Sequence, residues 1–145
     1  MPFFCRICRT LKLQLVFRFL KKNWCKGFSA LKNICVHPKN KNFISAGDNR
    51  MLLGKSDPKS DVFDVLLYAS WNNHETLTIP SFVRIFESFA LNRCNVRKLE
   101  FLEDSCLEII ESKALDMSLL YSIQFPSSVR IVEESAFNCN HLLGT

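Results

Sequence analysis

One short phrase occurs three times in this chain. Residues 125–137 read FPSSVRIVEESAF and residues 79–91 read IPSFVRIFESFAL, identical at seven of thirteen aligned positions. A third copy, LEIIESKAL, spans residues 107–115, so that the shared Ile-x-Glu pairs lie 24 and then 22 residues apart. A unit of this length cannot bury its own apolar strand, whereas stacked units cover one another. The repeat therefore predicts a solenoid, in which recurring residues report position in the stack rather than chemistry.

Before each copy comes a pair of apolar residues separated by one polar or small residue, the pattern of a short strand with one apolar face. The pairs are Leu77/Ile79, Leu99/Phe101 and Ile123/Phe125, with a fourth pair upstream at Ile34/Val36. The segment after each strand, such as residues 132–139, has apolar residues at mixed spacing and predicts a tight turn plus one short helical turn. The expected fold class is a β-rich α+β solenoid, a stack of short parallel strands joined by turns or short helical turns.

An expected β-hairpin interrupts the regular spacing. Residues 50–70 hold two apolar runs around GKSDPKSD, whose Gly, Ser, Asp and Pro favour turns. We therefore expect a solenoid over residues 27–145, with a hairpin-containing variant unit at about 37–76 and regular units at about 77–98, 99–122 and 123–145. Residues 1–26 are expected to form a basic N-terminal segment, a worn repeat or a cap, with a strand pattern at residues 11–19.

The net charge of +5 is distributed unevenly. Residues 1–47 contain ten Lys and Arg and no acid, whereas residues 48–145 carry five more acids than bases. A basic half can bind nucleic acid or an anionic membrane through counterion release, and a solvated Lys-rich face is the other interpretation. No stretch reaches the about 20 apolar residues of a membrane span, and no signal peptide is evident, so a cytoplasmic location is expected from the sequence as given.

Seven cysteines are an odd number, and without an export signal reduced thiols are expected. Cys5 and Cys8 have the Cys-x-x-Cys spacing of a zinc site, but a structural site needs a second pair. The remaining candidates, Cys25, Cys35 and His37, lie at irregular spacings. We therefore predict no metal site and no cofactor, and expect the cysteines to be small buried hydrophobes.

The sequence predicts no enzyme, because catalysis needs a convergent nucleophile, base and orienting group. His37, His74 and His141 lie in three separate polar stretches without a neighbouring motif. The repeat also aligns three glutamates, which we expect to cap or solvate the same turn of each unit. They are Glu87, Glu111 and Glu133.

The repeated pattern resembles the BspA-type leucine-rich repeat, whose unit runs approximately Leu-x-x-Ile-x-Ile-Pro-x-Ser-Val-x-x-Ile-Gly-x-x-Ala-Phe-x-x-Cys. The matching residues are Leu77, Ile79, Pro80, Ser81, Val83, Ile85, Ala90 and Cys94 in one unit, and Ile123, Phe125, Pro126, Ser128, Val129, Ile131, Ala136, Phe137 and Cys139 in another. Residues 36–43 and 52–70 resemble a variant unit common in the parasitic-flagellate branch of that family. The resemblance implies a non-enzymatic protein-interaction scaffold. Family members are often described as surface antigens or adhesins, which makes the cell surface the alternative location.

Outward-facing residues of a stack of strands lie about 4.8 Å apart and can vary without disturbing the core. The predicted binding residues are therefore Thr78, Glu100 and Gln124, with Lys98 and Ser122 beside them. The expected partner is a protein of unknown identity. Two alternatives stay open: a nucleic-acid or anionic-membrane binder acting through residues 1–47, and a repeat fragment without a function of its own.

Overall fold

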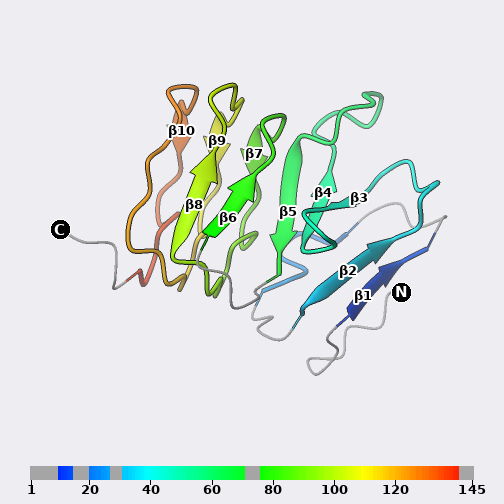
Figure 1. The fold of residues 1–145 in the computed structure, drawn as a ribbon, viewed down its shortest axis with the longest axis horizontal. Helices are drawn as coiled ribbons and strands as arrows, with labels where there is room; N and C mark the ends of the chain where they lie inside the picture. The colour runs from blue at the N-terminus through cyan, green and yellow to red at the C-terminus, as the bar shows by residue number, and fades with distance from the viewer. Residues whose placement is uncertain (1–9, 15–19, 27–30, 71–75, 141–145) are drawn as a thin grey trace.

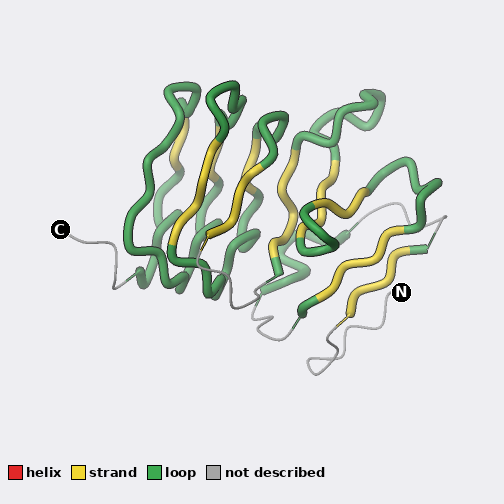
Figure 2. Tube along the Cα trace, viewed as in Figure 1, coloured by secondary structure: helices red, strands yellow, loops and turns green. Residues whose placement is uncertain are grey.

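A computed structural model describes residues 10–14, 20–26, 31–70 and 76–140, and these residues form ten strands in three sheets (Figure 1, Figure 2). Two sheets have two parallel strands each. They are β1 (Thr10–Leu13) with β2 (Asn33–Val36), and β6 (Thr76–Ile79) with β8 (Lys98–Phe101). The third sheet has six strands in the order β10-β9-β7-β5-β4-β3. Its members are β3 (Ile44–Ala46), β4 (Met51–Gly54), β5 (Val65–Ala69), β7 (Ile85–Phe86), β9 (Ile109–Ile110) and β10 (Ile131–Val132).

The repeated phrases stack in register, as a solenoid requires. Ile85 of β7 pairs with Ile109 of β9, which pairs in turn with Ile131 of β10, and all three strands are parallel. On the other face of each coil, β6 and β8 are parallel too, with Thr78 opposite Glu100. The coil of β6 and β7 and the coil of β8 and β9 therefore each contribute one strand to each face, and the prediction of a stack of short parallel strands is confirmed.

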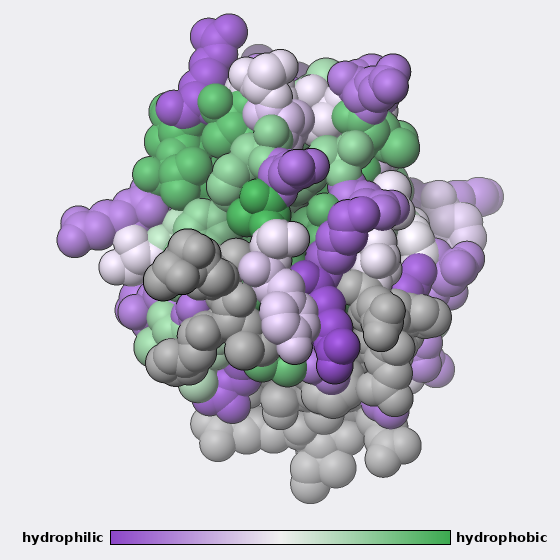
Figure 3. Space-filling view, turned by 60° about the vertical axis from the view of Figure 1, so that its left-hand side comes forward, coloured by the Kyte–Doolittle hydropathy of each residue, from purple (hydrophilic) through white to green (hydrophobic). Residues whose placement is uncertain are grey.

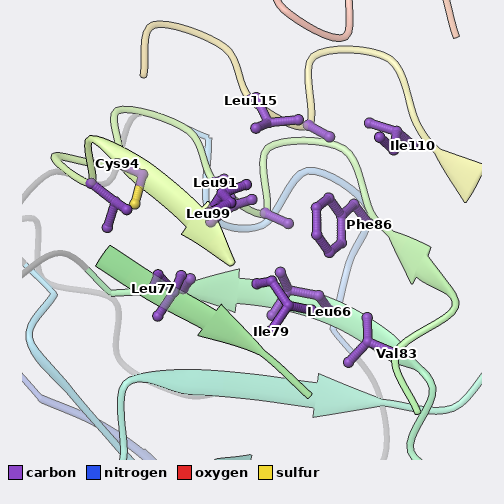
Figure 4. Close-up of a cluster of buried hydrophobic side chains, with 14 of the residues drawn as sticks. Leu66, Leu77, Ile79, Val83, Phe86, Leu91, Cys94, Leu99, Ile110 and Leu115 are labelled. Carbon is purple, nitrogen blue, oxygen red and sulfur yellow. The ribbon is translucent and has the colours of Figure 1, made fainter. Parts of the chain in front are cut away.

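The core fills the space between the two faces. Ile79, Phe86 and Ile110 are fully buried and belong to one continuous cluster that runs through successive coils (Figure 4). Burying one such side chain contributes about 1.5–3 kcal/mol. The alternation expected for residues 77–79 is confirmed, because Leu77 and Ile79 are buried and Thr78 is exposed.

The third expected strand, at residues 123–125, does not form. This segment joins β8 through a single bridge between Lys98 and Ser122, and Phe125 is exposed whereas Ile123 is half-buried. A strand needs a ladder of partners, and no described residue pairs with the outer side of this segment.

The expected short helical turns are wrong: the described residues contain no helix. Each unit instead runs through successive β-turns, in which the amides of Ala90, Ala114 and Ala136 donate to the carbonyls three residues earlier. In each turn the residue before the alanine has a left-handed φ of about 60°, a conformation that an α-helix cannot contain. These residues are Phe89 (φ 65°), Lys113 (φ 60°) and Ser135 (φ 62°). The α part of the expected α+β class is therefore corrected.

The predicted hairpin is confirmed. β4 and β5 are antiparallel, with Gly54 opposite Val65 and a register shift between Leu52 and Leu53. An additional strand, β3, pairs with the outer edge of β4, and β5 passes the sheet on to β7 in a parallel arrangement. Every residue of β4 and β5 is buried, because the hairpin has the solenoid core on one side and a second cluster on the other.

That second cluster joins the N-terminal part of the chain to the hairpin. Leu11, Leu13 and Cys25 pack with Leu52 and Leu67 in one group of buried side chains. β1 forms at the start of the predicted strand pattern 11–19, whose residues 15–19 lie outside the described part. The described residues before position 27 therefore share a core with the hairpin.

Candidate functional site

The five residues predicted to bind a partner line one groove. Its walls include Thr78, Lys98, Glu100, Ser122 and Gln124, and its volume is about 590 Å³. Further lining residues are Leu99, Phe101, Leu102, Glu103, Ser105, Phe125, Pro126 and Ser127. The prediction that these side chains bind a ligand is not tested by their position, but the structure brings all five together.

Strand pairing fixes the positions of these side chains. Thr78 lies opposite Glu100 in the β6–β8 ladder, and Lys98 pairs with Ser122 one coil further on. All five side chains point away from the core, since their neighbours Leu77, Ile79 and Leu99 are buried. The outward positions of successive strands therefore form adjacent rows.

One wall of the groove is formed by residues 102–105, in a connection that is two residues longer than the equivalent connection of the preceding coil. Five residues lie between Phe101 and the next inward residue, Leu107, whereas three residues lie between Ile79 and Val83. The longer connection makes a turn in which the amide of Ser105 donates to the carbonyl of Leu102. Because β8 pairs with the next coil only at Lys98–Ser122, the space between this turn and residues 124–127 stays open.

The groove combines charged and apolar surface. Lys98 Nζ lies 2.9 Å from Glu100 Oε1, an exposed ion pair worth about 0–1 kcal/mol. Glu103 forms no ion pair within the described part of the chain. Leu102 is 48% exposed and Phe125 is 38% exposed. Such a surface offers a peptide both apolar contacts and hydrogen-bonding groups, with more acid than base among its walls.

Two of the three aligned glutamates form hydrogen bonds to the neighbouring coil. Glu111 Oε2 accepts hydrogen bonds from the amide and the hydroxyl of Ser88, and Glu133 Oε2 accepts one from the amide of Ser112. Each of these two glutamates therefore caps a turn, as expected, but the turn belongs to the preceding coil. Burial, and secondarily the nearby Glu111, raises the pKa of Glu87 to about 7.

A second charged row was missed from the sequence. Arg84 Nη2 lies 2.9 Å from Glu108 Oε2, and Arg84 Nη1 lies 3.5 Å from the buried Asp64 Oδ2. The hydrogen bond and charge of Arg84 lower the pKa of Glu108, and Arg130 on the next coil adds to this effect. The signal was present, because residues 84, 108 and 130 occupy the same repeat position and alternate in charge.

The five cysteines that the structure describes do not form a site. Cys25 and Cys94 are buried, as expected, and burial raises their pKa values to about 12 and about 11, which keeps both as thiols. Cys35, Cys106 and Cys139 are exposed, so the expectation of buried hydrophobes is wrong for these three. Cys5 and Cys8 lie outside the described residues. Within the described ranges no cluster of three His, Cys, Asp or Glu could hold a metal ion.

The basic residues of the N-terminal part are exposed wherever the structure describes them. They are Lys12, Lys21, Lys22, Lys26, Lys32, Lys39 and Lys41. Binding of nucleic acid or anionic lipid through residues 1–47 stays a prediction. In the part of the chain that is described, no helix has the length and apolarity to cross a bilayer.

Comparisons with known proteins agree with this geometry. A family model described as "BspA type Leucine rich repeat region (6 copies)" matches residues 67–144, which is more than half of the chain. No curated protein matches the sequence.

Two solved structures share the fold. One is the crystal structure of the pneumococcal vaccine antigen PcpA, whose sequence is 24% identical to this chain. The two structures superpose with a TM-score of 0.71, and the match covers 83% of this chain and 28% of that chain. A leucine-rich repeat protein from Eubacterium ventriosum is 12% identical, with a TM-score of 0.50 over 94% of this chain and 60% of that chain. This chain thus spans less than two thirds of either structure, and at these identities the likeness shows the fold alone.

Proposed function

Because the chain belongs to the BspA-type leucine-rich repeat family, we propose that it is a non-enzymatic scaffold that binds a protein ligand. A repeat fold does not by itself define an activity. The proposal therefore rests on one observation: Thr78, Glu100 and Gln124, predicted from the repeat pattern, line a single groove with exposed apolar side chains. Adhesion at the cell surface, in place of a cytoplasmic role, is the form of this function that the family suggests.

The groove suits an extended peptide segment. Exposed Leu102 and Phe125 supply apolar contact, and Glu100, Glu103 and Gln124 supply hydrogen-bond acceptors along its length. Burial of a few aromatic or aliphatic anchors carries most of the free energy of such an interface, while the polar groups fix orientation.

The test uses a displayed library of random peptides. Peptides that bind the full chain are selected, and their dissociation constants are then measured for the wild type and for the triple variant Thr78→Lys, Glu100→Lys, Gln124→Lys. We expect the groove variant to lose at least about tenfold in affinity, which corresponds to about 1.4 kcal/mol.

The matched control is Pro58→Lys, Asp61→Lys, Val62→Lys, which changes the net charge equally in the exposed loop between β4 and β5. Selected peptides that bind the groove variant and the control equally well would overturn the proposal. Measuring the same affinities across a range of salt concentrations, with a random DNA duplex and anionic vesicles alongside, tests the alternative. A steep loss of DNA or vesicle binding with salt, without peptide binding, would favour residues 1–47 as the functional surface.

A further inference from the structure

The C-terminal end of the six-stranded sheet exposes residues that the other coils bury. Val132 occupies the same stacked position as Phe86 and Ile110, which are fully buried, yet it is 47% exposed. Its neighbour Ile131 is 50% exposed. Figure 3, which turns this side of the molecule forward, shows hydrophobic side chains gathered on it and bordered by hydrophilic ones.

The backbone of β10 is also unpaired on its outer side. The amides of Ile131 and Glu133 donate to Glu108 and Ile110 of the preceding coil, at 3.0 Å and 2.9 Å. Because successive residues of a strand direct their backbone groups to opposite sides, the N–H and C=O of Val132 point outward. No described residue bonds to them. Such an edge is a template for another strand.

The open edge carries one base and one acid, which are complementary to the acid and the base on the same edge of a second copy. A row of side chains that alternate in charge crosses the sheet and ends with a base at the open edge. Its members are Asp64, Arg84, Glu108 and Arg130. Two residues beyond Val132 lies an exposed acid, Glu134. Among the described residues neither Arg130 nor Glu134 has an ion-pair partner within salt-bridge distance. Base, apolar centre and acid thus follow one another symmetrically about Val132.

We propose that this end of the solenoid binds a second copy of the same chain, with the two β10 strands antiparallel about a two-fold axis at Val132. In that arrangement Val132 faces Val132 of the partner subunit and the pair exchanges both backbone hydrogen bonds. Antiparallel pairing also brings Arg130 opposite Glu134 of the partner subunit, and the reverse, so both charges gain a partner. The interface covers the apolar surface of Ile131, which a monomer leaves exposed.

Sedimentation equilibrium of the full chain, in reducing buffer and from about 1 to 200 μM, tests the proposal. We expect a monomer–dimer equilibrium for the wild type. Val132→Lys should weaken dimerisation by about a hundredfold, because two unpaired ammonium groups would meet at the axis. The matched control is Val62→Lys, which places the same side chain at a similarly exposed position, 51%, in the hairpin loop. Circular dichroism checks that both variants keep the strand content of the wild type.

Charge reversal tests the geometry independently. Arg130→Glu and Glu134→Arg should each weaken the dimer by about tenfold, whereas the double variant should return its dissociation constant to near the wild-type value. A wild type that stays monomeric at 200 μM would overturn the proposal. Equal dissociation by Val62→Lys and Val132→Lys, or a double variant as weak as the single ones, would overturn it as well. None of these readouts involves the groove, so they are independent of the proposed peptide binding.

Discussion

Glu111 Oε2 lies 3.0 Å from the backbone nitrogen of Ser88 and 3.2 Å from its hydroxyl oxygen, one coil earlier in the solenoid. Glu133 repeats the arrangement on Ser112, at 2.8 Å from the backbone nitrogen. In these two coils the turn carries an amide that its own backbone leaves without an acceptor, and the next coil supplies the acceptor. Hydrogen bonds of this kind connect neighbouring coils in addition to the strand ladders and the shared apolar core.

Glu111→Ala should destabilise the protein by about 1–3 kcal/mol, because it leaves the amide of buried Ser88 without its acceptor. Urea unfolding, monitored by circular dichroism, gives the change in free energy of unfolding. The control is Glu103→Ala, an exposed glutamate without an ion pair among the described residues, for which a change within about 0.5 kcal/mol is expected. Equal effects of the two substitutions would show that the hydrogen bonds to Ser88 contribute nothing net.

The partly buried Glu87 predicts a specific pH dependence. Its pKa is raised from 4.5 to about 7, chiefly by burial and then by the charge of Glu111, while Lys22 opposes the shift. The folded protein therefore binds this proton more tightly than the unfolded chain does. The stabilisation is fully present below about pH 4.5 and is lost as the pH rises through 7.

Glu87→Gln removes this titration at nearly constant volume. The free energy of unfolding of the variant, relative to wild type, should therefore increase between pH 5 and pH 8, by about 1–2 kcal/mol after allowing for the partial exposure of the side chain. Urea unfolding at several pH values measures the difference. Parallel stability curves for the two proteins would mean that Glu87 titrates at its ordinary pKa in the folded state.

Shortening a side chain to alanine should destabilise the protein by different amounts at equivalent positions of the stack. Ile110 is fully buried between two coils, so Ile110→Ala should cost about 2–5 kcal/mol. Val132 occupies the same position in the last described coil and is 47% exposed, so Val132→Ala should cost less than about 1 kcal/mol in dilute protein. Thermal or urea unfolding of the two variants at a few micromolar compares them directly. Equal losses would contradict the difference in burial.

The left-handed turn positions should favour glycine over alanine. Lys113 has a φ of 60° and an exposed side chain without a hydrogen bond in the described part. A left-handed conformation costs an L-residue about 1–2 kcal/mol, and glycine avoids this at the expense of about 0.5–1 kcal/mol of unfolded-state entropy. Lys113→Gly should therefore be more stable than Lys113→Ala by about 0.5–1 kcal/mol in urea unfolding. The opposite order would show that this backbone position is not left-handed in solution.

The hairpin was predicted from two apolar runs around the turn-forming residues GKSDPKSD. The repeat in the sequence was enough to predict the stack and the row of outward residues. The in-phase Ile-x-Glu pairs fixed which residues meet across β7, β9 and β10, because units too short to fold alone must bury their apolar side against the next unit. Alternation then placed Thr78 and Glu100 outside and Leu77 inside. These features follow from periodicity, which a single chain displays directly.

Only the tertiary structure decided the conformation of the turns and the opening of the groove. The left-handed turn positions hold three residue types with no shared preference for this φ: Phe89, Lys113 and Ser135. The amide of Phe89 donates to the carbonyl of Lys113, and the amide of Lys113 donates to the carbonyl of Ser135. Hydrogen bonds between coils therefore hold these residues in place. The groove opens where β8 keeps a single bridge to Ser122, and Val132 is exposed because no described strand follows β10. Each of these features depends on what the adjacent coil supplies, and residue types within one unit do not encode that.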